Sequence, residues 1–138
     1  MTTRFFWCLA VLTLPLAAGG CGGQRLVSVS GRVTHQGRPV PSTLVTFQPD
    51  DGGRPSKGVT DDDGRFTLRY SRTEAGASRG RCAVFLTYVV SNEEELRQAP
   101  PKASKELKAV IAGYGDPAKS GLHHEITKDG QFIEITLE

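Results

Sequence analysis

Apolar residues recur at every second position along several short stretches of the chain. In residues 26–33, Val27, Val29, Gly31 and Val33 share one parity, and most of the residues between them are polar. A period of two is typical of a strand with one buried and one solvated face. The pattern predicts further strands at residues 43–48, 57–60, 66–70, 82–88, 122–127 and 133–137.

Turn residues separate these stretches. Gly and Pro cluster at residues 35–39 and 49–53, and Asp63-Gly64 predicts a hairpin between the strands at 57–60 and 66–70. Because no long helices alternate with the strands, the pattern favours an antiparallel sandwich over a parallel sheet. The expected fold is therefore an all-β, seven-stranded antiparallel β-sandwich.

Residues 91–118 break the alternation. Ser91 and Glu94 have the spacing of a capping box, but Pro100 and Pro101 end any helix within about two turns. Residues 105–111 also show helical spacing, again briefly. We expect a long crossover between strands five and six that contains at most short helical turns. Connections of this length often carry function.

The first twenty residues have the features of an export signal. Arg4 is the only charged side chain before an apolar run at 5–18, which is too short to span a bilayer comfortably. Small residues at 17–20 then lead into Cys21 and resemble the lipobox at which bacteria attach lipid to a cysteine, although Ala18 stands where Leu is usual. Plain secretion after cleavage within 17–20 is the alternative.

This motif predicts three parts of the chain. Residues 1–20 are a lipoprotein-type signal peptide, 21–25 a tether that begins at the acylated Cys21, and 26–138 a single domain. Cys8 would leave with the signal, so Cys82 would be the one free thiol and no disulfide could form within the mature chain.

Charge excludes one class of partner. The chain has 17 Lys and Arg against 15 Asp and Glu, a net charge of +2, and no basic cluster in the sequence. Nucleic-acid binding requires several cations on one face to neutralise phosphates. We therefore expect no nucleic-acid partner.

Several turn motifs together resemble a known domain. They are Val-Ser-Gly-Arg-Val at 29–33, Gly-Arg-Pro-Val at 37–40, Thr-Asp-Asp-Asp-Gly-Arg-Phe-Thr-Leu at 60–68, Gly80, and Tyr-Gly-Asp-Pro at 114–117. In order and spacing they resemble the carboxypeptidase regulatory-like domain, a small transthyretin-like (prealbumin-like) β-sandwich, as it occurs in a group of small bacterial lipoproteins. The resemblance covers about residues 27–137. Cys82, where such lipoproteins often carry Tyr, and His124, at an inward position usually apolar, depart from it.

The resemblance implies a non-catalytic module with a binding or structural role at the bacterial cell envelope and no cofactor. Its partners would be the membrane, through the lipid, and an unknown envelope protein or polysaccharide; the side of the membrane stays open. A carbohydrate-binding module is the alternative, with Tyr70, Phe85, Tyr88 and Tyr114 as candidate ligand contacts and Phe132 as a further aromatic. Assembly through an exposed edge strand is a third possibility.

Candidate chemistry is sparse. Asp61, Asp62 and Asp63 are consecutive, which suits a hairpin tip better than calcium ligands at alternate positions. His123 and His124 point to opposite faces of a strand, so they are poorly placed to share a metal ion. We expect Cys82 to be a buried small side chain and His124 a neutral one with a hydrogen-bond partner.

A metal-dependent enzyme on a transthyretin-like scaffold is a remote alternative. Hydroxyisourate hydrolases end in Tyr-Arg-Gly-Ser, whereas this chain ends in Ile-Thr-Leu-Glu at 135–138. Intradiol dioxygenases bind iron through two Tyr and two His, and the spacing of those residues here does not reproduce that set. No metal site and no catalytic residue is expected.

The lipid anchor is directly testable. Bacterial cells that express the full chain should incorporate labelled palmitate into it, and the label should disappear in Cys21→Ser, because the thiol of Cys21 is the predicted attachment point. Cys8→Ser is the matched control and should keep the label. Label that persists in Cys21→Ser would refute the anchor.

Overall fold

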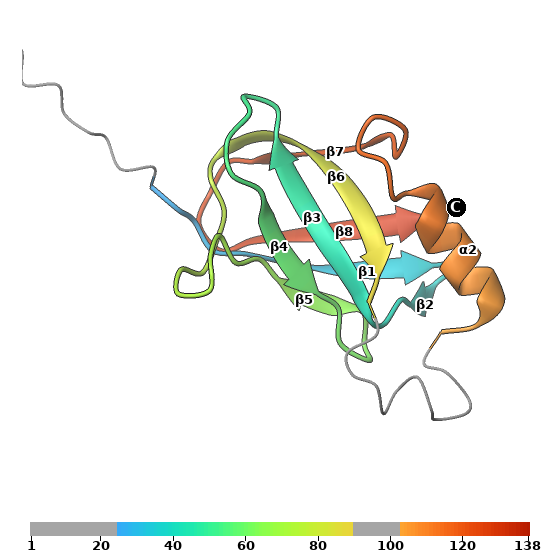
Figure 1. Ribbon diagram of the computed structural model, residues 1–138. Helices are drawn as coiled ribbons and strands as arrows, with labels where there is room; N and C mark the ends of the chain where they lie inside the picture. The colour runs from blue at the N-terminus through green and yellow to red at the C-terminus, as the bar shows by residue number, and fades with distance from the viewer. Residues whose placement is uncertain (1–24, 90–102) are drawn as a thin grey trace, which may run out of the picture.

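The computed structural model describes residues 25–89 and 103–138. The predicted signal peptide, Cys21 and the capping motif at Ser91 lie outside these residues. The described part is an all-β sandwich with one helix (Figure 1). Its strands are β1 (Val29–His35), β2 (Arg38–Pro39), β3 (Thr43–Pro49), β4 (Ser56–Val59), β5 (Arg65–Thr67), β6 (Gly80–Tyr88), β7 (Leu122–Ile126) and β8 (Gln131–Leu137).

The first sheet is built around β1. β8 pairs with β1 along all seven residues, while β2 and β5 pair with its two ends. Since β8 occupies one edge of β1, β2 and β5 share the other. A tight turn joins β1 to β2 at Gln36 and Gly37, whose φ angles are 51° and 75°. The predicted turn at 35–39 is thus present, and its last two residues add a short eighth strand in the described part.

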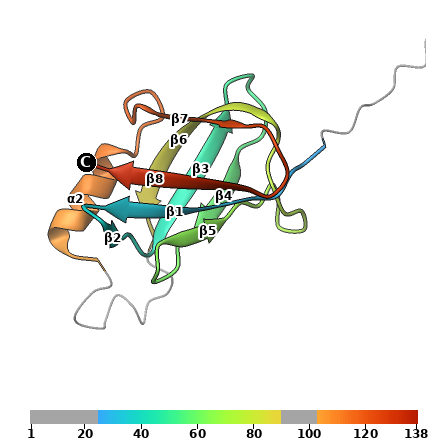
Figure 2. The same cartoon turned by 180° about the vertical axis from the view of Figure 1, so that it is seen from behind.

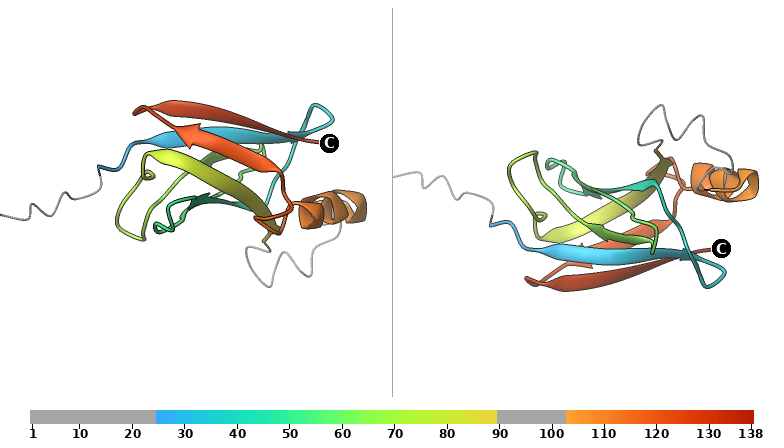
Figure 3. Two further views of the ribbon diagram at one scale, coloured as in Figure 1. Left: turned by 90° about the horizontal axis from the view of Figure 1, so that it is seen from above. Right: turned by 90° about the horizontal axis from the view of Figure 1, so that it is seen from below.

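The second sheet has the order β4-β3-β6-β7 and is antiparallel throughout. The two sheets pack as separate layers, which Figure 3 shows from above and below. The inward parity of each strand matches the alternation in the sequence: Cys82, Val84 and Leu86 of β6 are buried, as are Ile133 and its inward neighbours on β8. The periodicity therefore identified the core correctly.

One pairing contradicts the antiparallel expectation. β8 runs parallel to β1, with Ser30 opposite Phe132 and Thr34 opposite Thr136 (Figure 2). The turn at 127–130 carries the chain from β7 in one sheet to β8 in the other, so β8 meets a strand from the beginning of the chain. The sandwich is thus mixed, and not wholly antiparallel.

The hairpin predicted at Asp63-Gly64 is present in part: its turn is closed by a hydrogen bond of 2.9 Å from the Asp61 N–H to the Arg65 carbonyl, but the regular ladders of its strands are formed with other partners. β4 pairs with β3 and β5 pairs with β1, so the turn takes the chain from one sheet to the other. One antiparallel bridge joins the two predicted stretches, where Lys57 of β4 and Arg69, two residues after β5, exchange backbone hydrogen bonds of 2.9 and 2.8 Å. The regular strand β5 ends at Thr67, but the Leu68 N–H still donates to the Val29 carbonyl at 2.9 Å, so part of the strand predicted at 66–70 continues beyond β5.

The helix α2 (Lys105–Gly113) is longer than the short turns predicted for 91–118. The Ser104 side chain caps it by accepting a hydrogen bond from the Leu107 N–H at 3.2 Å. Ile111 is buried, and the helix packs against β6, where the Leu86 N–H donates to the Tyr114 carbonyl at 2.9 Å. Figure 1 shows α2 beside the C-terminus, at the opposite end of the sandwich from residue 25.

Within residues 25–89 and 103–138, no helix has the length and apolar character needed to cross a bilayer.

A substitution at Gly31 tests the packing of the first sheet. A Cβ at this position would lie 2.5 Å from the Phe66 ring and would also meet the Ile133 carbonyl, a backbone group that cannot turn away. Gly31→Ala should therefore lower the free energy of unfolding by about 1–3 kcal/mol. Gly113→Ala is the matched control: it meets nothing within 4 Å and should be neutral or stabilising by up to about 1 kcal/mol. Urea unfolding measures both, and equal stabilities would contradict the packing.

Candidate functional site

An open groove of about 790 Å³ lies where the edges of the two sheets meet at β4 and β5. We call it the β4–β5 groove. Its lining includes Phe132 and Val59, which are 55% and 50% exposed and are the large hydrophobic residues most exposed to solvent in the described part of the chain. The complete lining is Ser30, Gly31, Leu44, Lys57, Gly58, Val59, Asp61, Arg65, Phe66, Thr67, Arg69 and Phe132.

Strand register explains why this surface is hollow. Phe132 of β8 lies opposite Ser30 of β1, and Ser30 lies opposite Thr67 of β5, so these side chains form one row across the outer face of the first sheet. The two inner members of the row are small. Val59 lines the groove from β4, the edge strand of the second sheet, where it lies opposite Leu44 of β3. The groove therefore has small residues along its middle and an apolar side chain at each side.

The close approach of β5 to β4 beside the groove requires glycine at position 58. A Cβ on Gly58 would lie 2.6 Å from the Thr67 carbonyl oxygen. With glycine at this position, Thr67 of β5 can approach β4 closely, and Lys57 of β4 forms an antiparallel bridge with Arg69, two residues after β5. Gly58 thus determines how closely β4 and β5 approach each other beside the groove.

Three cations line the β4–β5 groove. Arg65 and Arg69 flank Thr67 along the chain, and Lys57 lies on β4; all three are exposed. In the part of the chain that the structure describes, no salt bridge engages any of them, since the ion pairs there join Arg81 to Asp50 and Lys119 to Asp116. The groove therefore presents positive charge beside apolar surface.

Asp61 is the one acidic residue of the lining, and its carboxylate already has backbone partners. Its Oδ1 accepts hydrogen bonds from the N–H groups of Asp63 at 3.0 Å and Arg65 at 2.9 Å. These bonds shape the turn between β4 and β5, which is the role that the sequence predicted for residues 61–63. Asp50 and Asp51 lie in the loop before β4, and this turn follows β4, so the strand separates the two acidic segments.

The candidate aromatic contacts do not form a common platform. Tyr70 lies under the Arg54 guanidinium, 5.4 Å from ring centre to Cζ, and Phe85 is on the outer parity of β6. Tyr88 and Tyr114 belong to the α2 end, where both pack against the core. Lys108 Nζ lies 4.7 Å from the centre of the Tyr88 ring, and the Tyr114 hydroxyl accepts a hydrogen bond from the Glu138 N–H at 3.1 Å. Phe132 alone among the aromatics named from the sequence lines the groove.

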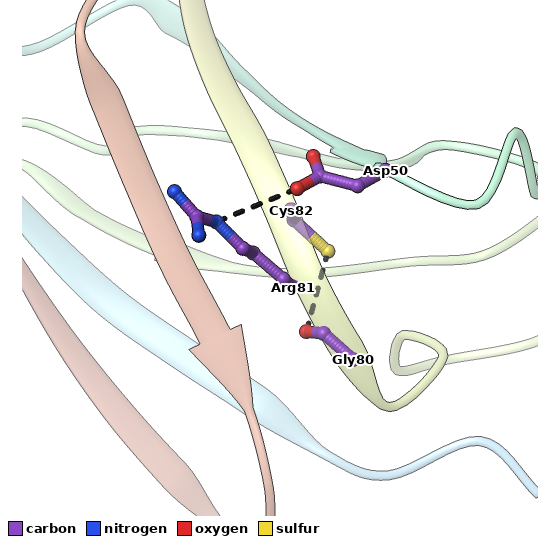
Figure 4. A network of polar contacts seen from close by, with 4 residues as sticks. All are labelled: Asp50, Gly80, Arg81 and Cys82. Atoms are coloured by element: carbon purple, nitrogen blue, oxygen red, sulfur yellow. Dashed lines mark hydrogen bonds and ion pairs between the residues drawn. The ribbon is translucent and has the colours of Figure 1, made fainter.

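Cys82 is 1% exposed and faces the core from β6. Burial, with smaller contributions from Asp50 and Asp51, raises the pKa of its thiol to about 11. Figure 4 shows the neighbouring Arg81 directed to Asp50, with Nε 3.4 Å from Oδ2, while the thiol donates weakly to the Gly80 carbonyl at 3.8 Å. A thiol that stays protonated at neutral pH is a poor nucleophile, so this cysteine fits a packing role.

The three histidine side chains have different surroundings and do not converge on one site. His35 Nδ1 is 3.1 Å from the Leu137 carbonyl oxygen, near the α2 end, whereas His123 and His124 occupy opposite faces of β7. His124 packs against Phe47 with ring centres 6.2 Å apart, a ring contact in place of the hydrogen bond expected from the sequence. Burial first, and then His123, lowers the pKa of His124, which favours its neutral form. Within the described ranges, no three His, Cys, Asp or Glu side chains are grouped to hold a metal ion.

Sequence reasoning missed Lys57, Val59, Arg65 and Arg69 as site residues. Two signals could have found the groove: Val59 and Phe132 are large apolar residues at positions whose parity points to solvent. That they meet in one groove depends on the parallel β1–β8 pairing, which the alternation alone does not specify.

Comparison of the chain with protein-family models, with curated proteins and with solved structures found no match.

Proposed function

We propose that this chain is an exported, lipid-anchored, non-catalytic module of the bacterial cell envelope that binds a partner through the β4–β5 groove. The observation that carries the proposal is that the exposed side chains of Val59 and Phe132 both line one groove, together with three cations. Exposed apolar surface rimmed by polar groups is typical of a binding site, because leaving it in water without a partner is unfavourable. The transthyretin-like type of the sandwich is part of the proposal and is supported by the turn motifs at 29–40 and 60–68.

The position of residue 25 agrees with a lipid anchor at Cys21. Residue 25 is four steps along the chain from Cys21, and extended chain spans at most about 3.6 Å per residue, so the tether reaches roughly 14 Å. The end of the sandwich at residue 25 would then face the membrane and α2 would face away from it. The β4–β5 groove lies on the side of the sandwich between these ends, where a partner could approach it.

A non-catalytic role is supported by the chemistry of the described side chains. The buried thiol of Cys82 has a raised pKa, and the carboxylate of Asp61 serves the backbone of a turn. The groove itself offers cations, hydroxyls and apolar surface, which are suited to recognition, whereas catalysis requires a nucleophile or an acid–base pair in mutual reach.

A photo-crosslinking residue placed in the groove tests the proposal. With p-benzoylphenylalanine replacing Phe132 in the full chain, irradiation of intact cells should yield a discrete adduct, because the side chain would lie against the partner. The matched control places the same residue at Thr136, which is also exposed and on the outward face of β8 but outside the groove. Adducts of equal yield at both positions, or no adduct at Phe132, would contradict binding at the groove.

A further inference from the structure

The shape of the β4–β5 groove favours a polymer over a small molecule. Sites for small ligands are concave and bury most of the ligand surface, whereas this groove is open and lies across the outer face of β1 and β5. A segment of a longer chain could lie along it and leave at both ends. This step rests on the proposed function, namely that the groove is a binding site.

Charge narrows the class of polymer. Lys57, Arg65 and Arg69 contribute three positive charges, and the carboxylate of Asp61 already accepts two backbone hydrogen bonds. One guanidinium nitrogen of Arg69 donates to the Arg72 carbonyl at 2.9 Å, which orients the group while leaving its other donors available. Carboxylates are the complementary partners for such a group, and guanidinium binds them with two parallel hydrogen bonds.

The apolar side chains distinguish between acidic polymers. Leu44 and Val59 on one side and Phe132 on the other border the small residues Ser30 and Thr67. An aliphatic side chain fits the space between these walls, and acidic polysaccharides carry no such group. The combination of apolar walls with cations therefore fits an amphipathic acidic peptide.

The spacing of Arg65 and Arg69 predicts where acidic residues lie in the sequence of the bound peptide. Arg65 begins β5 and Arg69 lies two residues after it, bridged to Lys57; residues 65, 67 and 69 are exposed while 66 and 68 are buried, and four residues of extended chain span roughly 13 Å. Acidic residues four positions apart in an extended peptide have the same separation, and the residue midway between them faces the same way. We infer that the groove binds an extended peptide segment of a partner protein in which two acidic residues, four positions apart, flank an apolar residue.

Synthetic peptides test this inference directly. A labelled peptide with the core Asp-Thr-Leu-Thr-Asp is titrated with the full chain in detergent, and binding is followed by fluorescence anisotropy. We expect saturable binding that weakens as salt is added, because the contacts are charged. The same peptide with Asn for both Asp residues should bind at least about tenfold more weakly.

Variants of the groove locate the binding. Arg65→Glu and Arg69→Glu should each weaken binding of the Asp peptide at least about tenfold. Each substitution places a negative side chain beside the acidic residues of the peptide. Lys105→Glu, at the exposed start of α2, is the charge-matched control and should leave binding unchanged. Phe132→Ser should weaken binding of the leucine peptide. It should have little effect on binding of a peptide with serine in place of leucine, because that peptide makes no apolar contact with Phe132 for the substitution to remove. Circular dichroism confirms that each variant is folded.

Three results would overturn the inference. They are equal affinity for the Asp and Asn peptides, equal loss of binding in Lys105→Glu and the groove variants, and full competition by polygalacturonate, an acidic polysaccharide without aliphatic side chains. If the peptide fails to bind while the crosslink from Phe132 persists, the peptide class is wrong and the groove remains a binding site. If the crosslink also fails, the proposed function itself is wrong.

Discussion

The parallel pairing of β8 with β1 is the interaction on which both the closed sandwich and its groove depend. It directs Ile133, Ile135 and Leu137 into the core and places Phe132 beside Ser30 on the outer face. Gly31 permits the close approach of the Phe66 ring at the centre of the same sheet. Because side chains alternate between faces, a shift of one residue in this pairing would bury Phe132 and expose the three core residues. The hydrophobic core and the proposed binding surface therefore depend on one register.

Much of the fold could be predicted from the sequence because alternation reports which side chains are buried. It identified the inward faces of β1, β3, β6 and β8 and the turns between them. It does not report which strand lies next to which, so the parallel partner of β8 and the change of sheet between β4 and β5 were not foreseen. The nine-residue α2 was underestimated for a related reason: its stability comes from Ile111 packing against β6, a contact remote in sequence.

The site was less predictable than the fold. Tyr70, Phe85, Tyr88 and Tyr114 were chosen by residue type, and tertiary packing disperses them, with the last two partly absorbed by the core. Val59 and Phe132 each carry a local signal, an apolar side chain at a solvent-facing position. That both line the same groove depends on how β4, β5, β1 and β8 are arranged. The cations around them come from β4, β5 and the residues after β5, and nothing in their spacing along the chain marks them as a group.

Nuclear Overhauser effects between β1 and β8 test the central claim most directly. The parallel register predicts close proton contacts from Ser30 to Phe132 and from Thr34 to Thr136. An antiparallel arrangement of the same seven-residue strands would exchange these partners, with Ser30 opposite Thr136 and Thr34 opposite Phe132. Observation of the first pair of contacts supports the register and the groove built on it, and observation of the second pair would contradict both.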